Sequence, residues 1–166
     1  MQKNRQIPIV IFILLLAYMG KLYFFPSEFD TAKAHIATLT KLASFEGTLQ
    51  PLAMLSRLQA IKEAVTPDLV VDLSEFVSTA HRQEITQTAY SLKDLETFAP
   101  MYFKTFESIE VLTRDVKRIS ARQFQLVVIG RGRTSEKSFD DAYMFVVNFN
   151  QEWKLSEVKV MAPPTH

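Results

Sequence analysis

The apolar positions of this 166-residue chain fall into blocks with different periods. The first block runs from Ile7 to Phe25 and contains one charged residue, Lys21. As a helix it would be roughly 28 Å long, close to the hydrocarbon thickness of a bilayer. Because Lys3 and Arg5 precede it, the block predicts a membrane-spanning helix whose N-terminus stays in the cytoplasm.

The end of this block, "AYMGKLYFF", favours a retained anchor over a cleaved signal peptide. A cleavage site needs small residues two positions apart, and Ala17 and Gly20 do not have that spacing. Aromatic residues follow at 23–25, where they suit a membrane–water interface. We expect residues 1–26 to form a cytoplasmic stub and anchor in an inner (cytoplasmic) membrane, and residues 27–166 to form one extracytoplasmic domain. A cleaved signal is the alternative.

Three later blocks have apolar residues at helical spacing. The first follows Ser27 and should end at Gly47, in "FEGT". The second starts at Pro51, a residue suited to the first helical turn, and should end in "TPD". The third starts at Ser91, where an aspartate three positions later predicts a capping box, and Pro100 should kink or end it.

From residue 108 onward the period changes to two, which predicts strands. The stretches "ARQFQLVVIGR" and "FDDAYMFVVNF" are apolar on both faces and should lie inside a sheet. Helices followed by an antiparallel meander predict an α+β domain with helices packed on one face of the sheet. The expected strands are 69–73, a weak one within 81–90, 108–119, 121–131, 139–149 and 153–161.

Charge and composition exclude several functions. Beyond residue 26 the chain has 16 basic and 18 acidic side chains, so nucleic acid is not an expected partner. The absence of cysteine excludes thiolate nucleophiles and cysteine-ligated zinc. The histidines, at 35, 81 and 166, lack metal-ligand spacing, and no phosphate-binding loop or nucleophile elbow is present. We expect no metal and no cofactor.

The order of elements, with the segments "TPDLVVDL", "SLKDL" and "SFDDAYMFVVNFNQEWKLSEVKV", resembles the nuclear transport factor 2-like superfamily over residues 28–161. The resemblance implies a cone-shaped α+β domain in which a curved, mainly antiparallel sheet wraps a long helix and leaves a pocket. Enzymes, transport adaptors and assembly proteins share this fold, so function has to be argued from the site.

Enzymes of this superfamily use a pocket carboxylate or a His–Asp pair to move a proton beside a carbonyl, which makes Asp72, His81 and Tyr102 the fallback catalytic candidates. The simpler interpretation places Asp72 on the outward face of a strand and His81 in a solvated loop. Because no two candidates share a motif of defined geometry, we favour structural roles. The other candidates are Tyr90, Asp140, Asp141 and Tyr143.

A group of basic residues within twenty positions could form a strip for anionic headgroups or an acidic partner. Ordinary solvated strand faces are the simpler explanation. The group comprises Arg114, Lys117, Arg118, Arg122, Arg131 and Arg133.

Two functions follow from these patterns. The first is a single-pass, membrane-anchored, non-enzymatic interaction or assembly protein of a bacterial-type cell envelope, which docks to a protein partner or forms a homodimer. The alternative is a pocket for a small apolar molecule, either ligand-binding or isomerase- or cyclase-like. The 13 phenylalanines permit such a pocket, although aromatic residues at strand spacing more often form a core.

We predict that the mature protein retains residues 1–25. Intact-mass measurement of membrane-extracted protein should give the full-length 19.0 kDa. A product that begins near Lys21 or Tyr23 would contradict the anchor.

Overall fold

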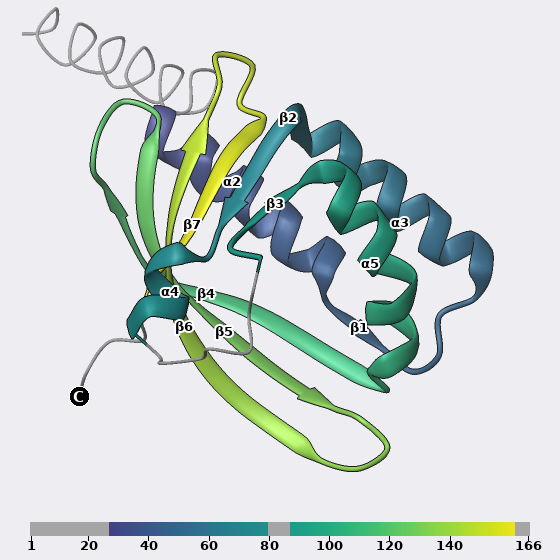
Figure 1. Cartoon of the computed structure of the whole chain (residues 1–166). Coiled ribbons are helices and arrows are strands. Elements are labelled where there is room, and N and C mark those ends of the chain that lie inside the picture. The colour runs from purple at the N-terminus through teal and green to yellow at the C-terminus, as the bar shows by residue number, and fades with distance from the viewer. Residues whose placement is uncertain (1–26, 80–86, 162–166) are drawn as a thin grey trace, which may run out of the picture.

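The computed structural model describes residues 27–79 and 87–161 and contains helices and one curved sheet (Figure 1). Its helices are α2 (Glu28–Ala43), α3 (Pro51–Ala64), α4 (Ser74–Thr79) and α5 (Leu92–Thr105). Its strands are β1 (Phe45–Glu46), β2 (Val65–Asp72), β3 (Ala89–Ser91), β4 (Ser108–Arg118), β5 (Gln123–Arg133), β6 (Ser138–Phe149) and β7 (Leu155–Met161). The predicted α+β class is confirmed.

The sheet has the strand order β1-β4-β5-β6-β7-β2-β3. Strands β4 to β7 form the predicted antiparallel meander, and β5 and β6 lie inside the sheet, as their two apolar faces indicated. The parallel pairing of β2 with β7 then joins the first half of the domain to the last strand.

Local sequence signals begin the helices where they were expected. The Ser27 hydroxyl accepts a hydrogen bond from the backbone N–H of Asp30 at 3.1 Å and caps α2. A complete capping box forms between Ser91 and Asp94 at the start of α5, and Pro51 occupies the first turn of α3. These contacts satisfy backbone N–H groups that have no partner within the helix.

Two prolines lie inside elements that the sequence pattern allowed them to end. Pro100 does not end α5, which continues to Thr105; the proline is exposed, so solvent can replace the missing helical hydrogen bond. Pro67, in "TPD", lies within β2 rather than in a loop. The register of β2 against β7 shifts between Val65 and Val70, and this irregularity accommodates a residue that cannot donate a ladder hydrogen bond.

Two elements of the structure, and the position of one residue, differ from the prediction. The short β1 extends the sheet beside β4, and α4 follows β2 directly. Trp153 lies in the β6–β7 turn, with a φ of 61°, instead of beginning β7. A strand was also expected within 81–90. The structure has β3 at Ala89–Ser91, and residues 80–86 lie outside the described residues.

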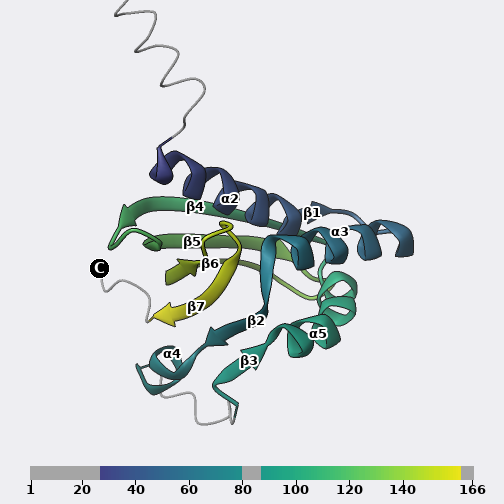
Figure 2. The ribbon, with the colours of Figure 1, turned by 90° about the horizontal axis from the view of Figure 1, so that it is seen from above.

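The main core lies between α2 and the inward face of the sheet. Alternation along β5 turns Phe124, Leu126 and Val128 inward, and the first two are buried. From α2, Ala32 and Ile36 are buried against this face, and the helix runs alongside β4 (Figure 2). The sequence pattern therefore sets both the orientation of the helix and the face that it covers.

A second core lies at the end of the sheet where α3 and α5 meet β1. Phe45, Phe103 and Ile109 are buried there beside Phe139. Gly132 is needed at this point, because a Cβ on it would lie 2.5 Å from the Phe139 ring and 2.8 Å from the backbone oxygen of Ser108. The two cores separate the domain into two packed ends.

Within 27–79 and 87–161, no helix is long and apolar enough to cross a bilayer. The predicted anchor, residues 7–25, lies outside the described residues. Membrane attachment therefore stays a prediction from the sequence.

Replacing Trp153 should destabilise the domain, and alanine should destabilise it more than glycine. The ring packs against Phe124, Phe149 and His35, so Trp153→Ala should lower the free energy of unfolding by about 3 kcal/mol. Trp153→Gly should lower the free energy of unfolding by about 1 kcal/mol less than Trp153→Ala does, because glycine adopts the positive φ without strain. Urea unfolding followed by circular dichroism measures both; a larger loss with glycine would contradict the turn conformation.

Candidate functional site

A hollow lies between the second half of α2 and the inward face of the sheet. Its volume is about 250 Å³. Twelve residues line it, and all but one are apolar: Ile36, Leu39, Thr40, Ala43, Val111, Leu126, Val128, Phe145, Val147, Phe149, Leu155 and Val158. The pocket that the superfamily resemblance implied is therefore present, and its walls come from β4 to β7 and one helix.

The chemistry of the hollow is that of a hydrocarbon-like site. None of its lining side chains titrates, and Thr40 supplies the one hydroxyl. Leu126, Val147 and Phe149 are buried, whereas Leu39, Val128 and Phe145 are only partly buried and lie toward the accessible part. Such walls bind apolar surface by removing it from water and offer no proton donor or acceptor of their own for acid–base catalysis.

Tyr102 lies outside this hollow, in the second core. Its hydroxyl donates a hydrogen bond to the carbonyl oxygen of Ala43 at 3.2 Å, and its ring meets those of Phe45, Phe103 and Phe106. Burial raises the pKa of Tyr102 to about 12. The hydroxyl therefore stays protonated at neutral pH and ties the end of α2 to α5.

Asp72 lies at the end of β2, opposite Lys159 of β7, and does not line the hollow. Its carboxylate accepts a hydrogen bond from the backbone N–H of Ser74 at 2.8 Å. Hydrogen bonds from the backbone and side chain of Ser74 lower the pKa of Asp72 below its ordinary value. The structure does not bring Asp72 and Tyr102 together around the hollow, and His81 lies outside the described residues.

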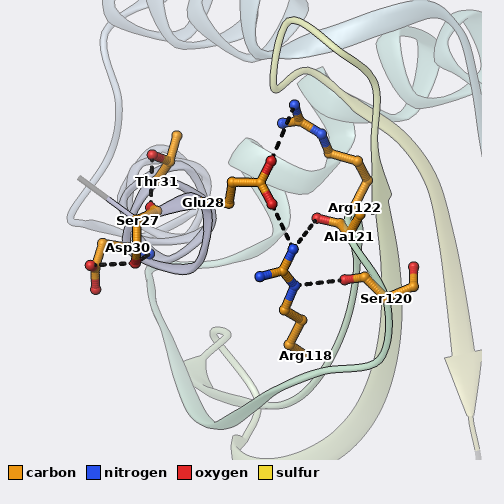
Figure 3. A network of polar contacts seen from close by, with 8 residues as sticks. All are labelled: Ser27, Glu28, Asp30, Thr31, Arg118, Ser120, Ala121 and Arg122. Atoms are coloured by element: carbon orange, nitrogen blue, oxygen red, sulfur yellow. Dashed lines mark hydrogen bonds and ion pairs between the residues drawn. The ribbon is translucent and has the colours of Figure 1, made fainter. Parts of the chain in front are cut away.

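Two of the candidate arginines meet at the β4–β5 turn (Figure 3). Arg118 forms an ion pair of 2.6 Å with Glu28 at the start of α2, and Arg122 approaches the same carboxylate at 3.9 Å. The Arg122 guanidinium also lies 3.9 Å from the centre of the Trp153 ring. These contacts fasten the start of α2 to the turn, which gives both arginines a structural role.

The other candidate arginines lie elsewhere on the sheet. Arg131 and Arg133 are at the opposite end of β5, where Arg131 pairs with Asp140 at 3.1 Å and Arg133 pairs with Glu107 at 2.8 Å. Arg114 is exposed on β4. The five arginines therefore do not form one continuous strip, because the length of β5 separates Arg118 and Arg122 from Arg131 and Arg133.

A second apolar groove, of about 310 Å³, lies between α3 and α5. Its residues are Pro51, Met54, Leu55, Leu58, Ala99, Pro100, Phe103 and Lys104. Beside it Leu52 is 80% exposed and Met101 is 61% exposed. The signal in the sequence was the helical spacing of Leu52, Leu55 and Leu58, which does not by itself distinguish a buried stripe from an exposed one.

No group of three or more potential metal-ligating side chains occurs in the described part of the chain. Several described acidic residues form helix caps or ion pairs, as Asp94 does with Ser91 and Glu28 with Arg118. The expectation of no metal and no cofactor stays a prediction.

Comparison with solved structures supports the fold assignment. No protein-family model and no curated protein matches the chain. A nuclear transport factor 2-like protein of unknown function from Exiguobacterium sp. 255-15 is 10% identical, with a TM-score of 0.56 over 79% of this chain and 99% of that one. The likeness to this structure confirms, at the level of fold, the resemblance found in the sequence.

Two further structures share the fold. The epoxide hydrolase/cyclase-like enzyme SalBIII, which has a role in pyran ring formation in the polyether salinomycin, is 8% identical, with a TM-score of 0.56 over 80% of this chain and 90% of that one. A computationally designed 17-OHP binder is 8% identical, with a TM-score of 0.55 over 78% and 88%. At these identities the likeness establishes the nuclear transport factor 2-like fold alone.

Replacing Tyr102 by phenylalanine should change the alkaline stability of the domain. Tyr102→Phe removes one hydrogen bond and should cost about 1 kcal/mol at neutral pH. Because the folded pKa of about 12 exceeds the ordinary value of 10.0, the unfolded chain releases this proton first. Wild-type stability should therefore fall from pH 10 to pH 12, and the variant should show a smaller fall in urea melts. Equal slopes would contradict the burial of the hydroxyl.

Proposed function

We propose that the domain binds a small apolar molecule in the hollow between α2 and the sheet, and that the N-terminal segment holds it at a membrane. The observation that carries this proposal is the composition of the walls, in which one threonine hydroxyl accompanies eleven apolar side chains. Burial of apolar ligand surface against such walls is favourable by roughly 25 cal/mol per Å².

The size of the hollow limits the ligand. An apolar cavity of about 150 Å³ holds benzene, so 250 Å³ admits a molecule of roughly ten to twelve non-hydrogen atoms. A longer molecule, such as an acyl chain, would have to extend past the partly buried side chains of Leu39 and Phe145. The proposed ligand class is therefore a compact apolar molecule or one end of a lipid-like one.

Binding without catalysis is the form of this function that the residues favour. SalBIII has a role in pyran ring formation and the designed structure binds 17-OHP, so some proteins of this fold transform small organic molecules and others hold them. A proton-transfer enzyme needs a base within hydrogen-bond reach of the substrate. The walls described here contain none, since Asp72 and Tyr102 lie outside them.

The predicted anchor adds a location to this proposal. An apolar segment at residues 7–25 would keep the domain beside a bilayer, where apolar molecules concentrate. The apolar ligand would then travel only a short distance between the membrane and the hollow. The orientation expected from Lys3 and Arg5 places the domain on the extracytoplasmic side.

The groove between α3 and α5 favours a second candidate, the non-enzymatic assembly function. Leu55, which lines the groove, is 63% exposed, and Leu52 on the same helix is 80% exposed, which is high for leucine. Exposed apolar patches of this kind mark protein contact sites. A docking partner and an apolar ligand would use different surfaces, so the two functions are separable by mutation.

Filling the hollow should abolish ligand binding. We predict that naphthalene, a probe of suitable size, raises the melting temperature of the purified full-length protein and that Val128→Trp removes this increase. Val128 lines the hollow, and the indole should occupy the space that the probe needs. Differential scanning calorimetry with and without naphthalene measures the effect.

Val127→Trp is the matched control, because Val127 is the preceding residue of β5 and points to the other face. The Val127→Trp variant should still show the rise in melting temperature with naphthalene. A shift that survives in Val128→Trp, or that is absent from the wild type, would overturn the pocket proposal. Loss of the shift in Leu55→Glu instead would point to the groove between α3 and α5.

A further inference from the structure

The β4–β5 turn, residues 119–122, presents a large apolar side chain to solvent at one end of the sheet. Ile119 is 51% exposed. The turn is held in place, since the backbone N–H groups of Ile119 and Ser120 both donate hydrogen bonds to the carbonyl oxygen of Gln123. A side chain that is already fixed in position loses little further freedom when it binds to another surface.

This turn lies beside the point where the domain begins. The start of α2, the β4–β5 turn and the β6–β7 turn lie at the same end of the sheet (Figure 1). Arg118 and Arg122 join the turn to Glu28, the first residue of α2 (Figure 3). The position of the turn is therefore fixed relative to the residues that follow the predicted anchor.

The link between the predicted anchor and the domain is very short. The apolar block ends at Phe25, and Ser27 already caps α2, so Pro26 and Ser27 form the link. Two residues span about 7 Å, and the headgroup region of each leaflet is about 5–8 Å thick. The start of α2, and the turn fixed to it, would therefore lie at the depth of the lipid headgroups.

Two cations without an acidic partner lie next to the turn. The register of β4 against β5 shifts between Arg114 and Lys117, and Asp115 has a φ of 51°. Because of this bulge, Arg114 lies opposite Val127 and Lys117 opposite Gln125, and both cations share the outward face of the sheet. Both are exposed, and neither forms an ion pair with another described residue. Their charges are available to a ligand outside the domain.

Charge is distributed unequally between the two ends of the long strands. Six basic and four acidic side chains lie at the end beside the start of α2, in residues 28–33, 114–122 and 150–154. Three basic and six acidic side chains lie at the opposite end, in residues 46–48, 107–110 and 131–141. An anionic membrane surface attracts the first end and repels the second, which orients the domain.

We propose that the β4–β5 turn docks on the membrane that holds the anchor, with Ile119 among the headgroups and with Arg114 and Lys117 on the phosphates of anionic lipids. This docking rests on the anchor of the proposed function but not on the hollow. Guanidinium and ammonium groups donate charge-assisted hydrogen bonds to phosphate oxygens. The short link favours lipid over an acidic protein as the occupant, because it keeps the turn at the bilayer whether or not a protein is present. Anchor and turn then form two attachments, which point the acidic end of the domain away from the bilayer.

The first test uses a single cysteine, because the chain has none of its own. Full-length Ile119→Cys, labelled with the fluorophore NBD, is placed in nanodiscs of phosphatidylcholine and phosphatidylglycerol in which some phosphatidylcholine carries a nitroxide on its headgroup. We expect the nitroxide to quench the label. Ser135→Cys, an exposed position in the β5–β6 turn, is the matched control. It lies about 37 Å away along the 11 residues of β5 and should stay unquenched.

The second test neutralises the two cations in the labelled Ile119→Cys chain. Replacing Arg114 and Lys117 together by glutamine should lower the ratio of docked to undocked domain about 20-fold, since each cation near an anionic surface contributes about a fivefold factor. Lys104→Gln with Lys137→Gln removes the same charge from exposed positions away from the turn and should leave the quenching unchanged. The emission of Trp153, the one tryptophan of the chain, reports whether each variant is folded.

The outcomes separate this docking from the rest of the proposed function. An unquenched Ile119→Cys label on a chain that stays in the nanodisc overturns the docking, leaves the anchor intact and makes an acidic protein the occupant of the two cations. Equal quenching with and without phosphatidylglycerol overturns the recognition of anionic lipid. A chain that does not enter nanodiscs overturns the anchor and the docking together, whereas the naphthalene shift tests the hollow independently.

Discussion

The packing of α2 against Phe124 is the contact on which the rest of the domain depends. Phe124 is fully buried. Its ring contacts Phe29 of α2, Phe149 at the end of the neighbouring strand β6, and Trp153 in the β6–β7 turn. Ala32, also fully buried, allows the helix to approach this closely. A larger residue there would lift α2 from the sheet and separate the surfaces that form the hollow.

Much of the fold was readable from the sequence because period and caps act locally. The two-faced apolar pattern of β5 and β6 placed them inside the sheet, and Ser27 and Ser91 marked the starts of α2 and α5. The errors arose where a longer-range contact outweighed a local preference. Pro67 is tolerated in β2 because the ladder to β7 shifts its register there.

The candidate site was less readable, since a hollow depends on the distance between elements and not on residue type alone. Thr40 and Ala43 are small residues of α2 that face Val128 and Phe145 across the hollow, yet in the sequence they look like ordinary helix positions. Asp72 was a catalytic candidate because enzymes of the superfamily use a pocket carboxylate. Its side chain in fact accepts a hydrogen bond from the start of α4, a helix that the sequence reading missed.

The parallel contact between β2 and β7 has a consequence for how the protein is made. The meander β4–β5–β6 can form from neighbouring hairpins as the chain emerges, but β2 has only β3 beside it until β7 is present. Contacts between residues so distant in sequence form slowly. During synthesis on the ribosome, the first half of the domain must therefore wait for the last strand. In that interval its unpaired strand edge and apolar helices are the surfaces on which a chaperone would act.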